Sequence, residues 1–190
     1  MSHLQREENL VWLDLEMTGL DPNRCAIVEI ATIITDSQLN ILAEGPAIAI
    51  RQDPGKLSAM EKWSRDTHTK SGLLRRVEAS NVSIDEAEKR TLEFIRHYCP
   101  EKTSPLCGNS IGHDRRFLER YMPALFDYFH YRNIDVSTVK ELVRRWFPHG
   151  QAAPAKKGSH LALEDIRESI NELLFYRETY FNKREREALF

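Results

Sequence analysis

The 190-residue chain lacks the features of membrane and secreted proteins. No apolar run approaches the roughly 18 consecutive residues that a transmembrane helix needs. Residues 1–8 contain no apolar stretch of the kind found in a signal peptide. The three cysteines form no C-x-x-C pair, and a small, odd set is typical of a reducing compartment. We therefore expect a cytoplasmic protein that does not associate with membranes.

A strongly basic charge balance is also missing. The chain has 27 Lys and Arg against 29 Asp and Glu, a formal net charge of −2. This argues against binding long nucleic acid through a basic stripe, because such binding depends on many contacts from Lys and Arg to phosphates. It does not exclude a nuclease, since bound metal ions can supply local positive charge. The balance mildly favours a substrate with few phosphates.

The pattern of elements predicts an α/β fold. Three segments typical of strands come first, at 10–15, 25–35 and 39–50, the last interrupted near Gly45-Pro46. Their short connections predict an antiparallel meander. Helical and strand patterns then alternate. We expect helical pieces within 58–72, helices at 84–99, 113–122, 138–146 and from 161 onward, and strands at 105–108 and 131–135. The order βββαβαβα predicts a mixed sheet flanked by helices.

Some helix boundaries carry their own signals. Ser83 and Thr138 each open a capping-box pattern, while Pro100 and Pro123 are expected to end helices. Residues 148–159 have the composition of a mobile loop. At this length and with 41% hydrophobic residues, we expect a single domain over residues 1–190, with flexible ends at 1–8 and 182–190.

Two acids occupy the end of the first predicted strand. Asp14 and Glu16 are two positions apart, so they fall on the same face, about 6.6 Å apart along the chain. Each charge raises the pKa of the other, and a divalent cation between them would balance the pair. A polar strand end with two solvated acids is the alternative.

Two further acids lie where helices are expected to begin, Asp114 and Asp165. Stabilisation by the helix dipole alone could explain either of them. In open α/β sheets, however, sites form at strand ends, where Asp14, Glu16 and Asp114 are all expected. Four converging acids would be balanced by two divalent ions such as Mg²⁺, a pair that promotes in-line displacement at phosphorus. His160 could then accept a proton from the attacking water.

These residues fall in three ordered segments: Asp14-Leu15-Glu16-Met17-Thr18-Gly19-Leu20, Asn109-Ser110-Ile111-Gly112-His113-Asp114 and His160-Leu161-Ala162-Leu163-Glu164-Asp165. With Trp63-Ser64, residues 68–73, Tyr131-Arg132 and residues 135–138, the chain resembles the oligoribonucleases over nearly its full length. These are a family of DEDDh 3′→5′ exonucleases with the ribonuclease H-like fold and a five-stranded mixed sheet. The loop at 151–157 is the part least similar to the family.

The resemblance implies an activity and a catalytic set. The expected reaction is 3′→5′ hydrolysis of very short oligoribonucleotides, especially dinucleotides, to nucleoside 5′-monophosphates, which completes RNA degradation. Two divalent cations, Mg²⁺ or Mn²⁺, are expected on Asp14, Glu16, Asp114 and Asp165, with His160 as the general base.

The resemblance also implies substrate contacts and a partner. Leu20 is expected to wedge against the bases, and Trp63 and His68 to lie near the 3′ end. The matching positions for the 5′ phosphate are listed as Ser110, Arg132 and Ser137. The family acts as a homodimer in which Tyr131 and Arg132 reach the site of the partner.

Each of these positions has a structural alternative that the sequence leaves open. The alternatives are a turn contact for Leu20, a core position for Trp63, a surface position for His68, a turn position for Ser110, a helix N-cap for Ser137 or Thr138, and strand packing for Tyr131. Two rival functions also remain. A DNA-proofreading subunit would have the same fold, and a non-catalytic binding module would need no complete set of acids.

Overall fold

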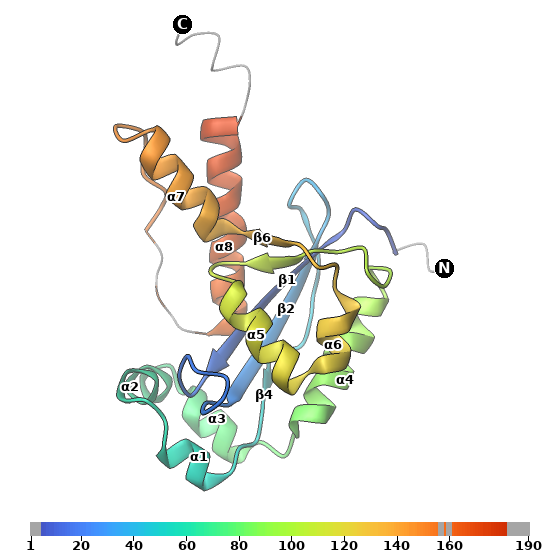
Figure 1. The fold of residues 1–190 in the computed structure, drawn as a ribbon, viewed down its shortest axis with the longest axis vertical. Helices are drawn as coiled ribbons and strands as arrows, with labels where there is room; N and C mark the ends of the chain where they lie inside the picture. The colour runs from blue at the N-terminus through green and yellow to red at the C-terminus, as the bar shows by residue number, and fades with distance from the viewer. Residues whose placement is uncertain (1–4, 156–157, 159–160, 182–190) are drawn as a thin grey trace, which may run out of the picture.

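The computed structural model describes residues 5–155, 158 and 161–181 of the chain. At its centre is a mixed sheet with strand order β3-β2-β1-β5-β6, and β4 also pairs with β2 (Figure 1). The strands are β1 (Leu10–Met17), β2 (Ile27–Thr35), β3 (Ile41–Glu44), β4 (Ile48–Ala49), β5 (Leu106–Gly108) and β6 (Asn133–Asp135). Strands β1, β2 and β3 form the predicted antiparallel meander, while β5 and β6 run parallel to β1. The α/β prediction is therefore confirmed, and β4 is the second half of the third predicted strand.

Helices cover both faces of the sheet. They are α1 (Pro54–Ser58), α2 (Lys62–Lys70), α3 (Leu73–Ala79), α4 (Ile84–Arg96), α5 (Gly112–Tyr121), α6 (Pro123–Tyr128), α7 (Val136–Trp146) and α8 (Ala162–Tyr176), which a π-helical segment, Arg177–Phe181, extends. Figure 1 shows α4, α5 and α6 grouped together, with α7 and α8 on another side of the sheet. No helix among the described residues is long and apolar enough to cross a membrane.

The alternation along β1 divides the core into two layers. Val11, Leu13 and Leu15 pack in a cluster with residues of α4, α5 and α6. Trp12 belongs to the other cluster, together with residues of α7 and α8. Asp14 and Glu16 follow Trp12 at intervals of two, so they lie on the α8 side of the sheet.

Several predicted boundaries are corrected by the structure. Helix α7 begins at Val136, because Asp135 accepts a hydrogen bond from the backbone N–H of Ser137 and acts as the N-cap. Thr138 is therefore inside the helix. Pro123 ends one helix and opens the next, since a proline at the first helical position loses no hydrogen bond. The predicted cap at Ser83 is confirmed, but α4 ends at Arg96 rather than at residue 99. Helices α1 and α3 were not predicted.

Candidate active site

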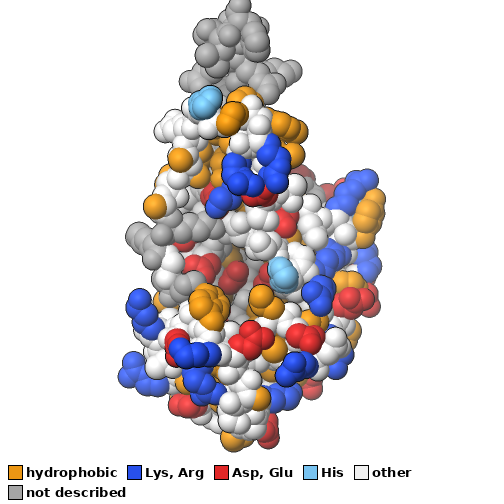
Figure 2. All heavy atoms as spheres, turned by 60° about the vertical axis from the view of Figure 1, so that its left-hand side comes forward, with side chains coloured by type: hydrophobic (Ala, Val, Ile, Leu, Met, Phe, Trp, Pro, Cys, Tyr) orange, Lys and Arg blue, Asp and Glu red, His pale blue; other side chains and the backbone are white. Residues whose placement is uncertain are grey.

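Three carboxylates meet where β1 ends beneath the first turn of α8. Asp14 and Glu16 come from β1, and Asp165 comes from α8. Each offers one oxygen to a group in which all three lie within 4.8 Å of one another. Figure 2 shows acidic side chains in a hollow on one face of the molecule, with hydrophobic side chains at its edge. The sequence prediction that these acids converge is confirmed for this triplet.

The fourth acid, Asp114, reaches β1 from the first turn of α5. Strand β5 pairs with β1 only at Val11 and Trp12, so the far half of this edge of β1 has no neighbouring strand. There the backbone N–H of Leu15 donates to Oδ1 of Asp114 at 2.9 Å, and the carboxyl is buried. Helix capping alone does not account for Asp114, because its carboxyl binds the strand that carries Asp14 and Glu16.

Burial and like charge raise the pKa values of these acids. Burial raises the pKa of Glu16 to about 8, and the charges of Asp165, Glu29 and Asp114 add to the effect. The pKa of Asp14 is also well above its ordinary value, first through burial and then through Asp114 and Glu16. Burial raises the pKa of Asp114 to about 7, although the hydrogen bond from Leu15 opposes the shift. A cation would relieve this repulsion, and a set of carboxylate oxygens suits Mg²⁺ or Mn²⁺.

His68 lies against the acids and is buried, so its reading as a surface histidine is wrong. Its Nε2 lies 2.9 Å from the carbonyl oxygen of Met17, which can only accept, so this nitrogen carries the proton. Its Nδ1 is 3.8 Å from Oε2 of Glu16. The ring is thereby held in one orientation beside the cluster. The proposed base, His160, lies outside the described residues.

Large apolar side chains near the predicted substrate positions are exposed. The exposed fraction is 59% for Leu20, 66% for Trp63 and 71% for Tyr131. The alternatives of a core position for Trp63 and of strand packing for Tyr131 are therefore wrong. Tyr131 precedes β6, and the guanidinium carbon of Arg132 lies 5.1 Å from the centre of its ring.

A pocket of about 320 Å³ lies between the first turns of α5 and α7. The residues lining it are Ser110, Gly112, His113, Arg116, Asp135 and Ser137. The prediction of a shared location for Ser110 and Ser137 agrees with this pocket, whereas Arg132 is not among the lining residues of this chain. Ser137 is not the N-cap, because both its N–H and its hydroxyl donate to Oδ1 of Asp135, at 2.9 and 2.6 Å.

Sequence reasoning missed three polar residues around the site. His113 and Arg116 flank Asp114 on α5 and line the same pocket as Ser110. Glu29, 1% exposed, forms an ion pair with Nη2 of Arg76 at 2.5 Å and accepts from the backbone N–H of Ala162 at 3.4 Å. It thus ties the start of α8 to β2. The available signal was a single acid within an otherwise uncharged strand, Ile27–Thr35.

Comparisons with known proteins agree with this arrangement of acids. An exonuclease family model, RNase T, matches residues 11–173. The oligoribonuclease of Vibrio cholerae is 60% identical over 175 residues, which cover 92% of this chain and 97% of that protein. The oligoribonuclease of Yersinia enterocolitica is 55% identical over 179 residues, covering 94% of this chain and 99% of that protein.

Solved structures give the same fold at lower identity. Exonuclease I from Methylocaldum szegediense superposes with a TM-score of 0.68 at 20% identity, covering 92% of this chain and 41% of that one. A zinc-bound complex of Escherichia coli exonuclease I with single-stranded DNA gives a TM-score of 0.67 at 14% identity, covering 95% and 42%. This chain thus spans about two fifths of those enzymes, and the likeness concerns the fold alone.

Proposed function

The chain belongs to the oligoribonuclease family of metal-dependent exonucleases, and we propose that it hydrolyses very short oligoribonucleotides, dinucleotides above all, to nucleoside 5′-monophosphates. The observation that carries the proposal is the triplet of carboxylates from β1 and α8, with Asp114 bound to the same strand. A complete set of acids argues against a non-catalytic binding module, which would not need to keep buried carboxyls together.

Asp14, Glu16 and Asp165 would hold a divalent cation, and with Asp114 the four acids offer enough oxygens for two. When bound, Mg²⁺ or Mn²⁺ stabilises the attacking and leaving oxygens of an in-line displacement at phosphorus. The raised pKa values of Glu16 and Asp114 support this role, because the acids hold protons at neutral pH unless a cation replaces them. Glu29 and the N–H of Leu15 keep the two elements in place.

His160 is proposed as the general base that takes a proton from the attacking water. In the sequence it stands two residues before Ala162, the residue that Glu29 holds at the start of α8. An imidazole with an ordinary pKa near 6.5 can accept this proton at neutral pH.

The exposed apolar residues would hold the bases. Leu20 and Trp63 belong to the segments that flank the acid cluster, and His68 lies against Glu16. A base stacked on an aromatic ring gains about 1–3 kcal/mol whatever its identity, so such a site accepts most sequences. The pocket with Ser110 and Ser137 would take the 5′ phosphate and so limit the length of the substrate.

A homodimer is proposed as the active form. Tyr131 is mostly exposed, with Arg132 stacked on it, and neither lines the pocket of its own chain. Both side chains are thus available to a second copy, in which Arg132 would supply positive charge to the 5′ phosphate. Sedimentation of the wild type and of Tyr131→Ala tests this assignment.

A turnover series against RNA length tests the proposed function. Purified protein with Mg²⁺ should release monophosphates fastest from a 5′-labelled dinucleotide and progressively more slowly up to a heptamer. The absence of monophosphate from the dimer would end the proposal. Faster degradation of long single-stranded DNA than of RNA dimers would favour the proofreading alternative instead.

A further inference from the structure

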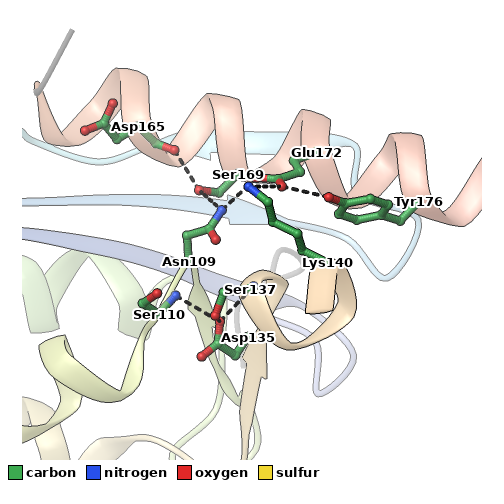
Figure 3. A network of polar contacts seen from close by, with 9 residues as sticks. All are labelled: Asn109, Ser110, Asp135, Ser137, Lys140, Asp165, Ser169, Glu172 and Tyr176. Atoms are coloured by element: carbon green, nitrogen blue, oxygen red, sulfur yellow. Dashed lines mark hydrogen bonds and ion pairs between the residues drawn. The ribbon is translucent and has the colours of Figure 1, made fainter. Parts of the chain in front are cut away.

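A network of buried polar contacts joins α8 to the turn that follows β5 (Figure 3). Its centre is Glu172, which is only 5% exposed. Nδ2 of Asn109 donates to one carboxylate oxygen at 2.9 Å, and the hydroxyl of Tyr176 donates to the other at 2.9 Å. Nζ of Lys140 lies 3.7 Å from the same oxygen as Tyr176. A buried carboxylate is costly unless it is bonded in this way, so the network holds its members firmly together.

The contact with Asn109 fixes one side of the turn. The Asn109 amide also donates to Oγ of Ser169 at 3.3 Å, and that hydroxyl donates to the carbonyl of Asp165 at 2.8 Å. Ser169 and Glu172 lie on the same side of α8, as Figure 3 shows. The side chain of Asn109 is therefore bound entirely to the helix that carries Asp165.

The opposite side of the turn is fixed by α7. Ser110 has a φ of 53°, in the left-handed region that a serine rarely adopts. Its N–H donates at 2.9 Å to Oδ1 of Asp135, the N-cap of α7. Such a backbone conformation persists only where the surroundings determine it from several directions. Asn109 and Asp135 provide these restraints, one on each side.

We infer that Glu172 is a positioning residue for the 5′-phosphate pocket: through Asn109 it holds Ser110 in the conformation that faces the substrate. This inference rests on the proposed function, because it assigns Ser110 to the 5′ end. Asp165 depends less on Glu172, since α8 is also packed against the sheet through buried Ala162, Ile166 and Ile170. Loss of Glu172 should therefore affect the phosphate pocket more than the acid cluster.

The test compares a 5′-phosphorylated dinucleotide with its 5′-hydroxyl counterpart. Glu172→Leu removes the acceptor but fills the space. We expect it to raise KM for the phosphorylated dinucleotide about 10-fold, the effect of a lost charge-assisted hydrogen bond, with kcat within about twofold. KM for the hydroxyl form and the Mn²⁺ affinity by calorimetry should stay within about twofold. A merely structural role would impair both substrates equally, which would overturn the inference.

Three variants keep the result interpretable. Glu172→Gln retains an acceptor for Asn109 and a donor for Tyr176, so it should restore most of the wild-type KM ratio. Tyr176→Phe, at the far end of the carboxylate, should leave the ratio unchanged. Asn109→Ala should reproduce Glu172→Leu without altering α8, and the double variant should be no worse than either single variant. Additive effects would contradict the inference.

Failure of the proposed function gives a different result. A wild-type protein that releases no monophosphate from either dinucleotide refutes the proposed function, and the positioning role falls with it. A wild-type protein that cleaves both dinucleotides with equal KM leaves the exonuclease proposal standing but overturns the role of Glu172.

Discussion

Glu16 provides a test of the electrostatics of the site in the absence of metal. Its pKa is about 8 in the folded chain, against 4.5 for an ordinary glutamate. A carboxyl with a raised pKa contributes fully to stability below the pKa of the unfolded chain. That contribution is lost as the pH rises toward the folded value. The metal-free protein should therefore become less stable between about pH 5 and pH 7, opposite to the trend for an ion-paired carboxylate.

The magnitude follows from the shift. Over this interval the carboxyl is mostly ionised in the unfolded chain and mostly protonated in the folded one. Each pH unit then costs about 1.4 kcal/mol, so the Glu16 contribution to the free energy of unfolding should fall by roughly 2–3 kcal/mol. The raised pKa of Asp114 acts in the same direction. Added Mn²⁺ at about 100 times its Kd should restore about 2.7 kcal/mol at neutral pH.

Urea unfolding in a chelating buffer, at a series of pH values, measures this effect. Glu16→Gln should flatten the decline, because the amide does not titrate. Glu119→Gln, which changes an exposed acid on α5, should keep the wild-type slope. If wild type and Glu16→Gln show the same pH dependence without metal, the repulsion argument is refuted.

Three other substitutions probe separate contacts. Arg76→Met leaves the buried carboxylate of Glu29 without its ion pair, so thermal unfolding should show a loss of about 2–3 kcal/mol, which adding Glu29→Gln should partly restore. Trp63→Ala should leave stability within about 0.5 kcal/mol but raise KM for the dinucleotide roughly 10-fold, because the exposed ring has a stacking role rather than a core role. Asp114→Asn should abolish turnover while the protein stays folded, whereas Asp114→Ala should also cost about 1–3 kcal/mol by leaving the N–H of Leu15 without its acceptor; equal stability of these two variants would contradict that hydrogen bond.

Much of the fold and of the acid cluster could be predicted because these features depend on local periodicity. Alternation along β1 is enough to place Asp14 and Glu16 on one face, and helix patterns place Asp114 and Asp165 in first turns. Pairing between distant elements is different. Glu172 stands in the helical pattern of α8 like any polar residue, and only the approach of the β5 turn reveals its contact with Asn109.

Competing caps explain the errors around residues 135–138. The sequence offered a capping box at Thr138, but Asp135 stands where β6 ends beside β5 and accepts from both Ser110 and Ser137. A cap that also holds a neighbouring turn gains hydrogen bonds that an isolated capping box cannot supply. The helix therefore begins where tertiary contacts satisfy the most backbone groups, which local sequence signals do not encode.

The short pairing between β1 and β5 connects the fold to the chemistry. If β5 continued beside β1, its backbone would take the N–H of Leu15, and no carboxyl would be needed there. Because the pairing stops after Trp12, the edge of β1 opens at the position where its two acids project toward α8. Asp114 satisfies that edge and at the same time joins the acids, so one side chain serves both the sheet and the cluster. The repulsion that raises the pKa values is thus a consequence of how the sheet ends, and a cation would remove it without any rearrangement of the strands.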